Sequence, residues 1–101
     1  MAKTFKKQPS ENVDYFIDLR PYFEELEGDF INDASDVVTT FLPATDLIEG
    51  ATVLVNAGLD GFKQWFSGGL DGVTYAITYL FTTDVGRVEE VEMKLKVKEV
   101  P

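Results

Sequence analysis

Alternation of apolar and polar side chains in residues 74–97 is the feature that most restricts the fold of this chain. Successive side chains of a β-strand point to opposite faces, so the alternation predicts two strands, each buried on one side. A three-residue loop at 84–86, with Gly86 in the left-handed conformation, places Thr83 opposite Arg87. A slip of one residue would exchange the faces. The predicted register gathers six side chains in the core: Tyr75, Ile77, Tyr79, Val91, Met93 and Leu95.

The opposite face of this hairpin carries threonine, lysine and glutamate, and we expect it to be solvated. Four earlier segments also have strand character, because they alternate, are rich in β-branched residues, or flank a glycine-rich turn. A chain of 101 residues has the usual size of one domain. These features predict an all-β fold, an immunoglobulin-like antiparallel β-sandwich of about seven strands. The four earlier segments are residues 13–19, 37–41, 51–55 and 62–66.

Three shorter features complete the predicted organisation. Residues 1–9 read as an extended N-terminal arm or edge strand, and residues 10–101 as the sandwich domain. A short helical turn is expected near Pro21 and Glu27, since proline favours the first turn of a helix. Gly72, three residues before Tyr75, suggests a tyrosine corner in which the Tyr75 hydroxyl bonds back to the preceding loop.

The composition excludes most catalytic chemistry. The chain has neither histidine nor cysteine, which removes the common triads, dyads and transition-metal sites. Paired carboxylates remain, but a glycoside hydrolase also needs a deep sugar cleft. Asp29, Asp33 and Asp36 could offer oxygen ligands to calcium, yet their spacing matches no EF-hand loop, and we interpret them as a solvated loop. We therefore predict no enzyme activity, no cofactor and no metal.

Charge and hydropathy restrict the partners. The formal net charge of −9 argues against nucleic acid, whose phosphates bind clustered lysine and arginine. The chain contains no apolar run near 18 residues, so no membrane span is expected. The first seven residues contain three lysines but lead into no apolar segment, so we expect no secretory signal.

Several aromatic side chains are candidates for a protein interface. Trp65 and Phe66 are consecutive, so on a strand they must point to opposite faces. We favour Trp65 in the core with Phe66 covered by a loop, and the alternative is an outward ring that contacts a partner. An exposed Trp65 would also suit a carbohydrate- or surface-binding module. The full set of candidate interface residues, including lysines of the arm, is Phe5, Lys6, Lys7, Phe16, Phe23, Trp65 and Phe66.

Residues 65–75 contain W-x-S-G-G followed by G-x-x-Y, and residues 82–87 add T-x-x-G-R before the closing strand at 91–97. In this layout the chain resembles a family of small tailed-bacteriophage virion proteins, described as fibre-tail adaptors or minor structural proteins. The opening at Phe5 to Pro9, with Asp14 and Tyr15, resembles that family too. The middle of the chain shows no clear alignment.

The resemblance implies an immunoglobulin-like domain in the virion and brings no catalytic residues with it. It implies that the chain joins neighbouring capsid, neck, tail or fibre proteins, and that it associates with itself in a symmetric assembly. The acidic net charge and the absence of common catalytic residues agree with such a role. The carbohydrate-binding module stays open as the alternative from another functional class.

Overall fold

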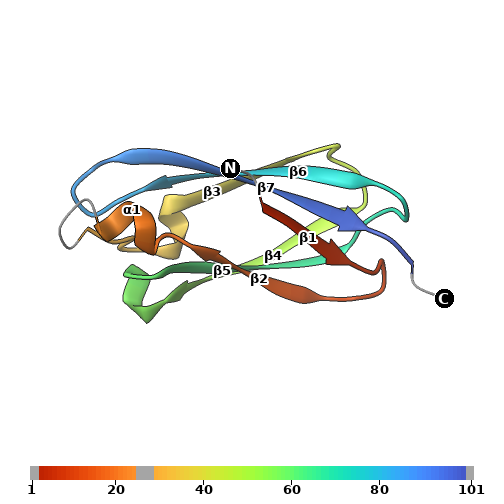
Figure 1. The fold of residues 1–101 in the computed structure, drawn as a ribbon, viewed down its shortest axis with the longest axis horizontal. Coiled ribbons are helices and arrows are strands. Elements are labelled where there is room, and N and C mark those ends of the chain that lie inside the picture. Colours follow the sequence, from red (N-terminus) through yellow and green to blue (C-terminus); the bar gives the residue numbers. More distant parts are fainter. Residues whose placement is uncertain (1–2, 25–28, 100–101) are drawn as a thin grey trace.

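Two β-sheets packed face to face form the computed structural model, which describes residues 3–24 and 29–99 (Figure 1). One sheet has four strands in the order β1-β7-β6-β3, and the other has three in the order β2-β5-β4. The strands are β1 Lys3–Lys7, β2 Val13–Asp18, β3 Val37–Leu42, β4 Leu47–Val55, β5 Gly61–Gly68, β6 Thr74–Thr82 and β7 Val88–Val97. The predicted all-β sandwich of about seven strands is thus confirmed for these residues.

The β6–β7 hairpin has the register expected from the alternation. Tyr75 pairs with Leu95, Ile77 with Met93 and Tyr79 with Val91. The amide of Thr83 donates to the carbonyl of Arg87 at 2.8 Å, and Gly86 has a φ of +93°. The apolar pattern alone therefore specified this pairing, because a slip of one residue would have placed the apolar side chains of one strand on the same face as the polar side chains of the other.

The N-terminal segment is a sheet strand, and it departs from the expected antiparallel arrangement. β1 runs parallel to β7, from the pair Lys3 and Met93 to the pair Lys7 and Val97. After β1 the chain crosses to the other sheet, where β2 begins, instead of turning back beside β1 (Figure 1). A parallel pair arises this way, since a tight hairpin can join only antiparallel strands. The division of the chain at residue 9 stays a prediction.

The core lies between the two sheets. It includes the six side chains that the hairpin register predicted, although Val91 is only partly buried. Aromatic rings from both sheets meet edge to face, such as Phe62 and Tyr79, whose centroids are 5.0 Å apart. The buried residues from other elements include Tyr15, Ile17, Leu19, Phe23, Ile31, Leu47, Phe62 and Phe66.

The side chains of strand β5 point to the opposite faces from those favoured from the sequence. Phe66 is fully buried, whereas Trp65 is half-buried on the outer face, so the placement of Trp65 in the core was wrong. The reason is Gln64, a buried polar residue on the same face as Phe66. Its amide donates to the carbonyls of Gly50 and Trp65, and its oxygen accepts from the Thr52 hydroxyl. These bonds satisfy Gln64 and hold β4 where its register shifts, between Glu49 and Thr52.

Short helices lie at the end of the sandwich opposite the C-terminus (Figure 1). They are α1 Arg20–Glu24 and the 3₁₀ turns η1 Ala34–Asp36 and η2 Asn56–Gly58. α1 begins one residue before the predicted helical turn, and the last part of that prediction, residues 25–27, lies outside the described residues. In the described part of the chain, no helix has the length and apolar character needed to cross a membrane.

Asp29 is buried and does not belong to a solvated loop, which corrects the interpretation of the acidic segment. Its Oδ1 accepts from the amides of Phe30 at 2.9 Å and Val85 at 3.4 Å, and Arg87 Nε lies 3.9 Å from its Oδ2. Asp29 therefore ties this segment to the β6–β7 loop. Asp33 instead caps η1 through the amide of Ser35.

Candidate interaction surface at the edge of the four-stranded sheet

The parallel pairing of β1 with β7 brings lysines from the two ends of the chain together. Lys6 pairs with Lys96, and both side chains are exposed on the outer face of the sheet. Lys98 follows β7, and its amide donates to the carbonyl of Lys7 at 2.9 Å. Lys6, Lys96 and Lys98 consequently form one basic group on an otherwise acidic protein.

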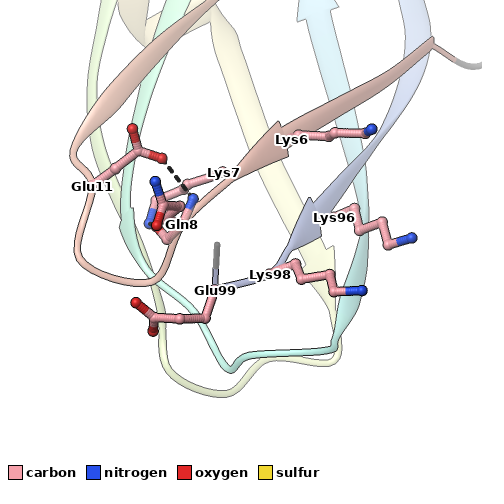
Figure 2. Close-up of a pocket in the computed structure, with 7 residues that line it drawn as sticks. All are labelled: Lys6, Lys7, Gln8, Glu11, Lys96, Lys98 and Glu99. Atoms are coloured by element: carbon pink, nitrogen blue, oxygen red, sulfur yellow. Dashed lines mark hydrogen bonds between the residues drawn. The ribbon is translucent and has the colours of Figure 1, made fainter. Parts of the chain in front are cut away.

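A pocket of about 490 Å³ opens beside these lysines (Figure 2). Figure 2 shows the side chains of Lys6, Lys96 and Lys98 extending in the same direction, with Gln8 and Glu11 on the other side of the pocket. We call this pocket the lysine pocket, and its lining residues are Lys6, Lys7, Gln8, Glu11, Lys96, Lys98 and Glu99.

Lys7 has a structural role at the back of this pocket. Its side chain is buried, and its ammonium donates to the carbonyls of Gln8 at 2.6 Å, Pro9 at 3.3 Å and Gly68 at 2.6 Å. Burial lowers the pKa of Lys7, and the Glu11 carboxylate partly opposes this effect. An ammonium has three donors. Because all three have partners, we remove Lys7 from the residues available to contact a partner.

Hydrogen bonds between side chains and the backbone hold the walls of the lysine pocket. The amide of Gln8 donates to the Glu11 carboxylate at 2.6 Å, which closes the loop after β1 (Figure 2). On the other side, the amide of Glu99 donates to the Asp71 carboxylate at 2.8 Å. The Tyr15 hydroxyl donates to the carbonyl of Lys6 at 3.1 Å and so ties β1 to the other sheet. The exposed lysines therefore project from a fixed frame.

Two more of the candidate interface residues line a second pocket, of about 370 Å³. Phe5 and Phe16 contribute to it, together with Tyr22 and Val91. Phe5 also packs on Tyr15, with ring centroids 5.0 Å apart. This pocket lies between β1 and β7 of one sheet and β2 of the other, so both pockets border the same edge of the sandwich.

The remaining aromatic candidates separate into buried and accessible positions. Phe23 and Phe66 are 5% and 0% exposed, and they pack on Phe81 and Phe41. Their rings fill the core and cannot reach a partner, which corrects their inclusion among the interface candidates. Trp65 lies on the outer face of the three-stranded sheet, against Gly50, and lines neither of the two pockets described above.

Two of the predicted turn residues, Gly72 and Tyr75, connect neighbouring loops through hydrogen bonds. Gly72 has a φ of +84°, and its amide donates to the carbonyl of Val97 at 2.8 Å. The Tyr75 hydroxyl accepts from the amide of Leu70 at 3.0 Å and donates to the carbonyl of Thr45 at 2.7 Å. Tyr75 thus connects its own preceding loop to the loop between β3 and β4.

Sequence reasoning missed Lys96 and Lys98. The hairpin alone predicts Lys96 on a solvated face of mixed charge, and Lys98 lies beyond the predicted strand, which ends at Val97. Their alternation with buried Leu95 and Val97 was visible, but only the pairing with β1 adds Lys6 to the same group. Among the described residues, no group of three acidic, histidine or cysteine side chains could hold a metal ion.

The sequence was also compared with known proteins. A family model described as "Podophage GP4 fiber-tail adaptor protein gp77" matches residues 7–96. A search of curated proteins returned no match. The matched range contains β2 to β6 and nearly all of β7. It also contains four of the seven residues that line the lysine pocket, namely Lys7, Gln8, Glu11 and Lys96, whereas Lys6, Lys98 and Glu99 lie outside it.

Proposed function

Because the chain belongs to the podophage GP4 fiber-tail adaptor family, a family of non-catalytic virion structural proteins, we propose that its lysine pocket holds an acidic segment of a fibre or tail protein. An adaptor of this family binds fibre and tail proteins. The proposal concerns which surface of the chain makes that contact. The observation that carries the proposal is the convergence of Lys6, Lys96 and Lys98 beside one pocket.

Electrostatics supports a carboxylate-bearing partner. The chain has 18 acidic and 9 basic residues, so most of its surface repels an acidic segment. The exposed lysines create a local exception, and three ammonium groups that extend together can each contact a carboxylate. Such contacts set the orientation and the association rate of a complex, and they weaken as salt increases.

Copies of the chain also associate with one another in this proposal, since virion components repeat around symmetric assemblies. Phe5, Phe16 and Trp65 are the aromatic candidates that remain accessible. The pocket beside the lysines, which Phe5 and Phe16 line, offers apolar surface next to the charged group. Aromatic anchors are typical of the centre of protein interfaces, and polar residues are typical of the rim.

A triple variant tests the lysine pocket. We expect Lys6→Gln, Lys96→Gln and Lys98→Gln together to abolish co-purification of the chain with the fibre or tail proteins of its phage. The thermal midpoint should stay within about 2 °C, because exposed lysines contribute little to folding. Lys63→Gln, on the outer face of the other sheet, is the matched control and should leave co-purification intact. Unchanged capture by the triple variant would rule out this surface.

A further inference from the structure

The four edge strands of the sandwich differ in how they are protected from pairing with another chain. Natural edge strands carry charges, bulges or prolines that prevent such pairing. β1 contains three lysines, β2 contains Asp14 and Asp18, and β4 contains Glu49 next to its register shift. β3 has none of these features, and its pairing with β6 is uninterrupted from Val37 to Leu42.

The outer face of β3 is apolar as well as uncharged. Val38 and Leu42 are 54% and 72% exposed. On the neighbouring strand, Leu80 lies opposite Val38 and Ala76 lies opposite Leu42. These four residues, Val38, Leu42, Ala76 and Leu80, form an apolar strip along an open strand edge. Water-exposed apolar surface beside unpaired backbone groups marks a site for strand addition.

We propose that β3 of a second copy of this chain adds antiparallel to β3, about a two-fold axis at Thr40. In a continuous sheet, directly opposite residues point to the same side. With Thr40 opposite Thr40, Val38 of each copy lies opposite Leu42 of the other on the outer face. The two apolar strips then become one, and two four-stranded sheets become one sheet of eight strands.

The neighbouring registers are less favourable. Moving the axis to Thr39 places Leu42 opposite Asp36 and so pairs an apolar with a charged side chain. In the Thr40 register Pro43, which has no amide hydrogen, lies only at the end of the ladder, opposite Val37, whereas moving the axis to Phe41 brings it further into the ladder, opposite Thr39. The self-complementary apolar pattern therefore selects Thr40.

Charge also permits a second copy at this edge. In the Thr40 register, Asp36 of one copy lies opposite Ala44 of the other, so no like charges face each other directly. The ladder itself contains no charged residue, although each chain has a net charge of −9. Salt screens the repulsion between the two chains. We therefore expect self-association to strengthen as ionic strength rises, the opposite of the salt effect expected at the lysine pocket.

Single cysteines test the register directly, because the chain has no cysteine of its own. Opposite Cα atoms in an antiparallel pair are about 4.5–5.5 Å apart, within the range that a disulfide bridges. Under mild oxidation we expect Thr40→Cys to form a covalent dimer. Val38→Cys and Leu42→Cys should each stay monomeric alone, and a mixture of the two should cross-link. Val53→Cys, exposed on β4, is the control and should not cross-link.

Sedimentation velocity provides the second measurement. We expect the unmodified chain to dimerise reversibly, and Thr40→Lys to raise the dimer dissociation constant roughly tenfold or more, because it sets like charges opposite each other. Val53→Lys should leave the constant unchanged. A monomer at every concentration and salt level would overturn the proposal. Cross-linking of Thr40→Cys with Lys6→Cys, in place of itself, would also overturn it, since that result indicates head-to-tail pairing of β3 with β1.

This inference rests on the part of the proposed function in which copies of the chain associate. It does not depend on the lysine pocket, which lies at the opposite edge of the same sheet. Loss of fibre or tail capture in the triple lysine variant, with dimerisation intact, would support both proposals. Loss of dimerisation in Thr40→Lys with capture intact would separate self-association from the adaptor contact.

Discussion

Gly86 has a backbone φ of +93° at the tip of the β6–β7 loop, a region that residues with a Cβ adopt at a cost. A Cβ built at Gly86 would meet nothing within 4 Å. Gly58 differs, because a Cβ there would lie 1.9 Å from the carbonyl oxygen of Ile31. At Gly86, the energetic cost of the left-handed conformation can therefore be measured without a steric clash.

We expect Gly86→Val to lower the free energy of unfolding by about 1–2 kcal/mol. A β-branched residue resists positive φ, and no new contact compensates. Gly86→Asn is the matched control and should cost less, because asparagine tolerates this region. Urea unfolding followed by circular dichroism gives both values. Equal stability of the valine variant and the parent chain would show that the loop adopts another conformation.

At the scale of the element, strand β5 shows how one polar residue decides which face of a strand is buried. Phe62, Gln64 and Phe66 point inward, and Lys63 and Trp65 point outward. The buried amide of Gln64 has partners on β4 and on β5 itself. With these bonds made, burial of the two phenylalanines outweighs the cost of taking one amide out of water.

The two consecutive aromatics of β5 should differ in their effect on stability. We expect Phe66→Ala to lower the free energy of unfolding by about 3–5 kcal/mol, since it empties a core site. Trp65→Ala should lower it by about 1–2 kcal/mol, because the indole is only half-buried. Circular dichroism in urea is the suitable measurement, as Trp65 is the only tryptophan. A larger loss at Trp65 than at Phe66 would contradict the observed facing of β5.

For the whole molecule, tyrosine hydroxyls help to join the two sheets. Tyr15 on β2 donates to the carbonyl of Lys6 on β1, across the open edge of the sandwich. Burial, with the negative charges of Glu11 and Asp14, raises the pKa of Tyr15 to about 12. Burial raises the pKa of Tyr79 as well, and its hydroxyl lies 3.7 Å from the Met93 sulfur. Both groups must keep their protons in the folded state.

These shifts predict a loss of stability in alkali. A tyrosine whose pKa is raised on folding contributes stability below its ordinary pKa of 10.0, and this stability is lost as pH rises toward the folded value. The lowered pKa of Lys7 has the opposite effect, because it makes stability rise with pH, but only up to pH 10.5, the ordinary pKa of lysine. We therefore expect the thermal midpoint to fall between pH 10.5 and about 12.

A pair of variants identifies the group that is responsible. Tyr15→Phe should lower the thermal midpoint at neutral pH, because it removes one hydrogen bond worth about 1 kcal/mol of unfolding free energy. It should also reduce the drop in the thermal midpoint between pH 10.5 and about 12. Tyr22→Phe, at an exposed residue, is the matched control for the substitution and should keep the midpoint of the parent chain at neutral pH. An alkaline profile of Tyr15→Phe that is identical to the parent would exclude this tyrosine as the cause.

Much of the fold and part of the candidate site could be predicted. The alternation after Thr74 led to the β6–β7 register, and glycine at position 86 led to the loop, because both are local signals with a period set by backbone geometry. The absence of histidine and cysteine removed most catalytic chemistry. The motifs from Trp65 to Arg87 led to the fibre-tail adaptor family, which the family match to residues 7–96 confirms.

The sequence by itself determined the class of fold, the closing hairpin and the family, since each depends on neighbours along the chain. Only the tertiary structure decided that β1 lies parallel to β7, and that pairing creates the lysine pocket from residues 90 positions apart, Lys6 and Lys96. It also decided that Gln64 is buried and Trp65 is not. The physical reason is the same in both cases: a strand partner and a buried amide's hydrogen bonds come from distant segments, and no local pattern encodes their position.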